Sequence, residues 1–85
     1  MAHESGRFAA ITPEQTSAVR SMTDLAVLVE QMREDLLGSG AREWENATLD
    51  RFLKALAAVA EDRAFEGTPT WADVAELLVT ATGYE

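Results

Sequence analysis

Residues that could perform acid–base or nucleophilic chemistry are few and scattered along this chain. His3 is the only histidine, cysteine is absent, and the four serines stand at positions 5, 17, 21 and 39. A catalytic nucleophile has to be held against a base that a third group orients. His3 lies in a segment without hydrophobic periodicity, so no rigid element is expected to hold such a pair. The sequence therefore favours a protein that is not an enzyme.

Acidic pairs occur as Glu34–Asp35 and Glu61–Asp62. Neighbouring helix residues project about 100° apart, so neither pair can share one substrate atom, and we interpret both as solvated helix faces. The motifs of zinc, di-metal and calcium sites are absent, as is the lysine that would make Gly38-Ser39-Gly40 a phosphate loop. The Asp-Ser-Leu turn of an acyl carrier protein is also absent. We expect no metal and no cofactor.

Composition and charge restrict the class of partner. The chain has 85 residues, of which 47% are hydrophobic and 26% are charged, and this balance predicts one folded domain. Fifteen acidic residues against seven basic ones give a net charge of -8, which repels phosphate backbones and anionic lipids. We therefore expect neither a nucleic-acid nor a membrane partner. Without a signal peptide or a long apolar run, the sequence predicts a cytoplasmic protein.

Helix caps and apolar periodicity predict an all-α fold. Thr12-Pro13-Glu14-Gln15 starts a short helix that ends near residue 20, and Ser21 starts a second helix that Gly38-Ser39-Gly40 should stop. A third helix runs from residue 46 or 48 to 63, and Thr70 with Asp73 starts a fourth. We predict a small compact bundle of three main amphipathic helices plus the short N-terminal helix, spanning residues 11–85, after a flexible segment over residues 1–10.

Apolar side chains at spacings of three and four define the faces expected to pack inside. These stripes comprise Leu25, Leu28, Val29, Met32 and Leu36 in the second helix, Leu49, Phe52, Leu53, Leu56, Val59 and Ala60 in the third, and Val74, Leu77, Leu78 and Ala81 in the fourth.

Both tryptophans stand where helices begin. Trp44 precedes the third helix, whose cap is either Asn46 or Thr48, and Trp71 follows the Thr70 cap of the fourth. A small core needs large side chains, so we interpret both indoles as buried structural residues, although tryptophan is also enriched at interface hot spots. Tyr84 is expected to pack its ring against the bundle.

The spacing of these residues resembles a known pattern. It comprises Trp44-Glu45-Asn46, Leu49, Phe52-Leu53-Lys54-Ala55-Leu56, Asp62, Pro69-Thr70-Trp71, Leu77-Leu78 and Tyr84-Glu85. The chain resembles, from about residue 19 to its end, a family of small bacterial proteins classed only as a domain of unknown function. The resemblance implies a stand-alone helical domain without an assigned active site, and it makes Trp44, Asn46, Trp71 and Tyr84 the positions most worth testing.

The functional hypothesis is a non-enzymatic protein–protein interaction or accessory module. A sharper version is an immunity- or antitoxin-like inhibitor that covers a basic partner by charge complementarity. Its contacts would come from the acidic C-terminal part of the chain, namely Glu61, Asp62, Glu66, Asp73 and Glu76. The alternative is a ligand-binding protein or enzyme with a pocket near Trp44, Trp71 and Tyr84. We expect a monomer or a weak homodimer.

Overall fold

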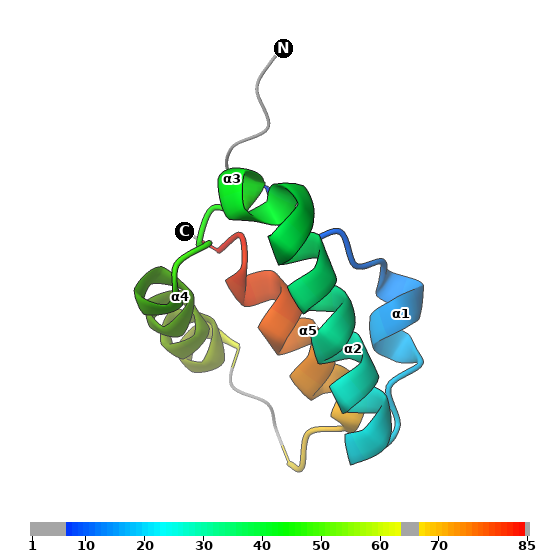
Figure 1. The fold of residues 1–85 in the computed structure, drawn as a ribbon. Helices are drawn as coiled ribbons and strands as arrows, with labels where there is room; N and C mark the ends of the chain where they lie inside the picture. Colours follow the sequence, from blue (N-terminus) through cyan, green and yellow to red (C-terminus); the bar gives the residue numbers. More distant parts are fainter. Residues whose placement is uncertain (1–6, 64–66, 85) are drawn as a thin grey trace.

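The computed structural model describes residues 7–63 and 67–84, and this part of the chain is helical without strands. Its elements are α1 (Pro13–Ser17), α2 (Met22–Asp35), a π-helical turn η1 (Leu36–Gly40), α3 (Ala41–Glu43), α4 (Leu49–Asp62) and α5 (Trp71–Ala81). The predicted all-α compact bundle, with three main helices and a short N-terminal one, is confirmed (Figure 1). The first helix ends at Ser17, earlier than the predicted end near residue 20.

Hydroxyl side chains begin the helices as the sequence predicts. Thr12 and Thr70 form complete capping boxes, with Gln15 and Asp73 returning the second hydrogen bond. Thr48 accepts from the backbone N–H of Arg51 and is therefore the cap of α4. Of the two caps that the sequence allows, Thr48 therefore caps α4, and the Asn46 side chain makes other contacts.

Helix α5 is the centre of the bundle, because α1, α2 and α4 each pack against it. In Figure 1, α2 and α5 run in the same direction, and α4 stands on the other side of α5 from α1. Ala75 and Ala81 of α5 are fully buried, and their small side chains let neighbouring helices approach closely. The core therefore forms around a helix whose most buried residues are alanines.

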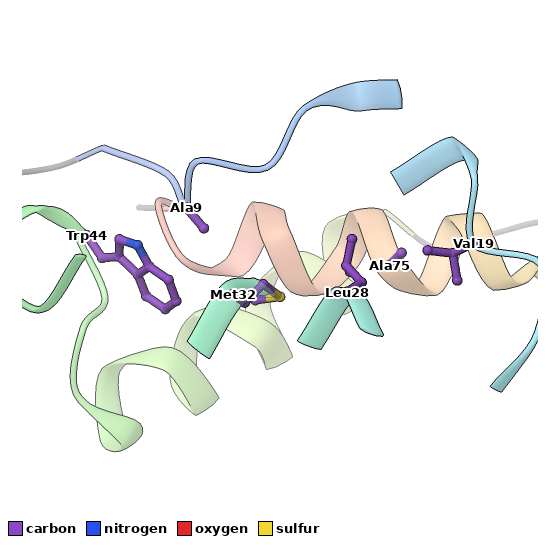
Figure 2. Close-up of a cluster of buried hydrophobic side chains, with 6 residues drawn as sticks. All are labelled: Ala9, Val19, Leu28, Met32, Trp44 and Ala75. Atoms are coloured by element: carbon purple, nitrogen blue, oxygen red, sulfur yellow. The ribbon is translucent and has the colours of Figure 1, made fainter. Parts of the chain in front are cut away.

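The buried hydrophobic cluster combines residues of α2 and α5 with residues from segments outside the helices (Figure 2). It comprises Ala9, Val19, Leu28, Met32, Trp44 and Ala75. Leu28 and Met32 come from α2 as predicted, whereas Ala9 comes from the segment expected to be flexible. Residues 7–10 of that segment are described and packed, and residues 1–6 lie outside the described residues.

Helix α2 ends at Asp35, just before the glycines, as the sequence predicts. The π-helical turn η1 follows, and Gly38 within it has non-helical backbone angles (φ -80°, ψ -109°), so the chain kinks between α2 and α3. A Cβ atom on Gly40 would lie 2.6 Å from Trp44 Nε1 and 2.8 Å from the Asp35 carbonyl oxygen. Glycine at position 40 is therefore what allows the backbone to pass directly beside the indole.

The predicted inner stripe of α4 is only half buried. Val59 is buried and Phe52 and Leu56 are half-buried, but Ala60 is exposed and the Leu49 and Leu53 side chains are 72% and 51% exposed. Their exposure follows from the arrangement of the bundle, because among the described residues α4 packs chiefly against α5. Val29 on α2, also predicted to be inside, is 45% exposed for a similar reason.

Candidate functional site

Asp35, at the end of α2, joins three separate parts of the chain. Its carboxylate accepts hydrogen bonds from both terminal nitrogens of Arg7 at 3.0 and 3.1 Å and from the Ala10 N–H at 3.1 Å. It also accepts from Trp44 Nε1 at 2.7 Å. The prediction that Glu34–Asp35 is a solvated pair is therefore wrong for Asp35, while the adjacent Glu34 is exposed.

Arg7 completes this polar cluster from the N-terminal segment. Besides Asp35, its guanidinium donates to Glu43, to Ser39 Oγ and to the Phe8 carbonyl oxygen. The backbones of residues 7 and 43–45 also pair, through Arg7 N–H to the Glu43 carbonyl and Glu45 N–H to the Arg7 carbonyl. We call Arg7, Asp35, Glu43 and Trp44 the N-terminal clasp.

The positive charge of Arg7 favours the ionised form of both carboxylates in the clasp. Hydrogen bonds from Arg7 lower the pKa of Asp35 despite partial burial, and the indole and Ala10 N–H donors lower it further. The pKa of Glu43 is lowered chiefly by its hydrogen bond from Arg7. Both carboxylates are thus stabilised as anions and have their acceptors occupied, which is the arrangement of a structural ion-pair cluster and not of a general acid poised near neutrality.

Asn46 closes the C-terminal end of α5. Its side-chain amide donates to the carbonyl oxygens of Ala81 and Tyr84 at 2.9 and 2.7 Å, and its backbone N–H donates to the Thr82 carbonyl at 2.9 Å. The last carbonyls of a helix lack partners within it, so these bonds satisfy groups that would otherwise be buried unpaired. Asn46 is itself buried. This position, one of those singled out in the sequence, therefore has a clear folding role.

The two tryptophans have different environments. Trp44 is 8% exposed, as the structural interpretation predicts, and its N–H is bound to Asp35. Trp71 is 37% exposed, so the prediction that both indoles are buried is wrong for this residue. It lines an open hollow of about 600 Å³ with Val19, Arg20 and Val74.

The predicted aromatic pocket does not form among the described residues. Trp44, Trp71 and Tyr84 line three different surface hollows. Trp71 begins α5 and Tyr84 follows its end, so the length of that helix, about 15 Å, separates them. The Tyr84 hydroxyl donates to Asp62, which raises the tyrosine pKa, and its ring lies beside α4 as predicted.

The acidic residues proposed for partner binding differ in their contacts. Asp62 accepts from Tyr84, and Asp73 is occupied in the capping box of α5. Glu76 lies beside the hollow between α5 and α1, away from α4. Glu61 is exposed near the end of α4, and Glu66 lies outside the described residues. Of the four that the structure describes, Glu61 and Glu76 are therefore the exposed acids that are not engaged by a tyrosine or a helix cap.

An apolar groove between α2 and α4 is a surface that the sequence did not predict. It is a hollow of about 260 Å³ whose lining includes Val29, Met32, Trp44, Leu49 and Phe52. We call this hollow the α2–α4 groove. Leu53, one turn after Leu49 on α4, is also exposed.

Two further observations concern metal ions and membranes. Among residues 7–63 and 67–84, no three His, Cys, Asp or Glu side chains are close enough to bind a metal ion. Within the same residues, none of the helices has the length and apolar character needed to cross a bilayer.

Comparison with known proteins agrees with the resemblance noted from the motif. No curated protein and no solved structure matches the chain. A family model described as a family of unknown function (DUF7660) matches residues 21–85, which include α2, the clasp residues Asp35 and Trp44, Asn46, α4 and α5. The chain therefore belongs to the DUF7660 family.

Proposed function

We propose that this protein is a non-enzymatic interaction module that binds a basic protein partner. The observation that carries the proposal is the uncovered apolar surface on α2 and α4. Leu49 and Val29, which line the hollow between these helices, are 72% and 45% exposed, and Leu53, one turn after Leu49, is 51% exposed. Contiguous apolar area of this kind on a soluble protein marks an interaction site more often than an isolated exposed leucine does.

The charge of the chain supports a basic partner. The net charge of -8 would speed the encounter with a positively charged protein and discourage acidic ones. An inhibitor that covers a basic surface, as immunity proteins and antitoxins do, is one form of such a module. Glu61 and Asp50 on the exposed side of α4 are the acids best placed to contribute.

The polar clusters support binding and not catalysis. The Asp35 carboxylate of the clasp accepts from several donors and the Glu43 carboxylate accepts from Arg7, while the Asn46 amide is occupied by the end of α5. The aromatic residues invoked for a ligand pocket line separate hollows. These contacts favour an interaction module over the alternative of a pocket enzyme.

A reconstituted complex tests the proposal. A partner captured by the tagged chain from its own organism would be purified and titrated by calorimetry at low and high ionic strength. We expect a partner of net positive charge and an affinity that falls as salt rises, because screening weakens the attraction between exposed charges. Glu61→Gln should weaken binding, whereas Glu14→Gln on α1, an equally exposed site, should not. An acidic partner, or an affinity indifferent to salt and to Glu61→Gln, would contradict the proposal.

A further inference from the structure

Residues 7–11 lie across one end of the bundle as a non-helical segment, which we call the N-terminal strap. Arg7 forms a single parallel β-bridge with Trp44, and its guanidinium pairs with the two acids of the clasp. The Ala9 N–H donates to Thr82 Oγ1 at 2.7 Å, and the Ala9 side chain is buried beside the C-terminal end of α5 (Figure 2). A backbone edge, an acidic site for one arginine and a place for one small side chain are the contacts by which proteins bind an extended peptide.

The groups that hold the strap all belong to the segment matched by the family. Asp35, Glu43 and Thr82 lie within that segment, whereas the strap precedes it. The backbone edge lies there too, because the Glu43 carbonyl accepts from the Arg7 N–H at 2.8 Å and the Glu45 N–H donates to the Arg7 carbonyl at 3.2 Å. We call Asp35, Glu43, Thr82 and this backbone edge the strap site. The site therefore belongs to the family domain, and its occupant comes from outside that domain.

The outer part of the strap is loosely packed. The Phe8 side chain is 50% exposed, and Ala10 is exposed as well. A hollow of about 320 Å³ stays open beside α5, with Phe8, Ile11 and Val79 in its lining. Well-packed interiors leave no space of this size. The charged and buried contacts of the strap come mainly from Arg7 and Ala9, so another segment with an arginine and a small residue at this spacing can replace it.

From these contacts we propose that the strap site binds an arginine-bearing segment of the basic partner, which replaces residues 7–11. The partner's arginine takes the position of Arg7 between Asp35 and Glu43, and its backbone pairs with the same edge. Arginine suits this position better than lysine, because its guanidinium donates to several acceptors at once. The N-terminal strap is then an autoinhibitory contact that fills the site until a partner displaces it. This inference rests on the proposed function and adds the site and the residue recognised.

The covalent connection of the strap sets how strongly it competes. A tethered segment has an effective concentration on the order of millimolar at its own site, so a free peptide with the same contacts must exceed that concentration to displace it. A second copy of the chain is the alternative occupant, because it offers an identical strap. Each copy has a net charge of -8, so the approach of a second copy is disfavoured while that of a basic partner is favoured.

Two variants of the full chain loosen the strap by different means. Arg7→Gln removes the charge that the acids of the clasp hold. Gly83→Ala acts by contact, because a Cβ atom at this position would lie 2.5 Å from Cδ1 of Phe8 and leaves Asp35 unchanged. Arg33→Gln is the matched control, since Arg33 is an exposed arginine of α2 that pairs only with Glu30 among the described residues. Circular dichroism checks that each variant folds.

Three hexapeptides are the probes. The first, Arg-Ala-Ala-Ala-Ile-Thr, copies residues 7–12 with alanine in place of Phe8, so that it clears the added methyl group of Gly83→Ala. The second has glutamine in place of arginine, and the third has the composition of the first in scrambled order. The indole N–H signals in NMR spectra report binding, because the Trp44 N–H donates to Asp35 within the clasp. Trp71, at the opposite end of α5 from Thr82, is the internal control.

We expect the Trp44 signal of Arg7→Gln and of Gly83→Ala to respond to the first peptide at concentrations at least about tenfold lower than in the wild type or Arg33→Gln. The first peptide should bind at least about tenfold more tightly than the other two, because only it places a guanidinium between the two acids. The Trp71 signal should not move. Arg7→Gln should also bind the purified partner more tightly than the wild type does.

Several results would overturn the inference. They are equal peptide affinity of the wild type and the loosened variants, equal affinity of the arginine and glutamine peptides, or a response confined to Trp71. A dimer in sedimentation that Arg7→Gln dissociates would also overturn it, since the occupant would then be a second copy. When a loosened variant fails to fold, the wild type with peptide in millimolar excess decides, because only the first peptide should shift its Trp44 signal.

The outcome also separates this inference from the proposed function. If the peptides fail while Glu61→Gln still weakens a purified basic partner, the interaction function stands and only the strap-site assignment falls. If neither the peptides nor a basic partner bind, both fall.

Discussion

Replacing Asp35 with alanine should destabilise the fold far more than replacing its exposed neighbour Glu34. Asp35→Ala removes the acceptor for the Trp44 indole N–H, the Ala10 N–H and two donors of Arg7. Glu34 is exposed on the outside of α2. The two residues are adjacent and acidic on the same helix, so the pair isolates the contribution of the clasp.

The size of the effect follows from which donors lose their partner. The indole N–H of Trp44 belongs to a residue that is 8% exposed, and an unpaired buried donor costs about 1–3 kcal/mol. The Ala10 N–H is on an exposed residue and can bind water, and the Arg7–Asp35 pair is partly screened, with side chains 27% and 18% exposed. The ion pair therefore adds about 1 kcal/mol at most. We expect a total loss of about 1–4 kcal/mol.

Urea denaturation followed by circular dichroism measures both variants. A loss of about 1–4 kcal/mol corresponds to a fall in Tm of about 5–30 °C for a domain of this size. Glu34→Ala should stay within about 0.5 kcal/mol of the wild type, as surface substitutions usually do. Equal and small changes in the two variants would show that Asp35 is as solvated as its neighbour and would refute the clasp.

Three further outcomes are expected. The pKa of Asp35 is lowered in the folded state. Its contribution to the free energy of unfolding is therefore present above the unfolded pKa of about 3.9 and is lost as pH falls through the folded pKa. Between these values the free energy of unfolding should fall more steeply with decreasing pH in the wild type than in Asp35→Asn. Asn46→Ala should cost about 1–3 kcal/mol in a urea titration, because it leaves the last carbonyls of α5 unpaired, and an unchanged midpoint would contradict the capping role. Acrylamide should quench the fluorescence of the Trp44→Phe variant, whose indole is Trp71, more than that of Trp71→Phe; equal quenching would mean that their exposures do not differ.

Local chemistry made the helices predictable. The hydroxyl caps at Thr12, Ser21 and Thr70 are set by residues at most three positions away, and the structure has all three. Apolar periodicity identified Leu28 and Val59 correctly as inward residues. These features depend on spacing within one helix, which a single sequence contains.

The clasp and the groove depend instead on contacts between distant segments. The Arg7–Asp35 pair joins residues 28 positions apart, and nothing near either residue distinguishes it from a surface charge. The exposure of Leu49 and Leu53 likewise depends on which helices cover α4, a property of the whole arrangement. Periodicity shows that a helix has an apolar face, but it does not show whether another helix of the same chain packs against that face.

The segment matched by the family begins at residue 21, after Ala9, Val19 and α1. Ala9 and Val19 nevertheless belong to the core, and α1 packs on α5. A polypeptide truncated to residues 21–85 would keep the whole family segment and lose Arg7, the donor that holds Asp35 and Glu43 together. One flank of α5 would then face water, and two neighbouring carboxylates would repel each other. Recombinant work on this domain should therefore retain the leading twenty residues, since the boundary of sequence similarity is not the boundary of the folding unit.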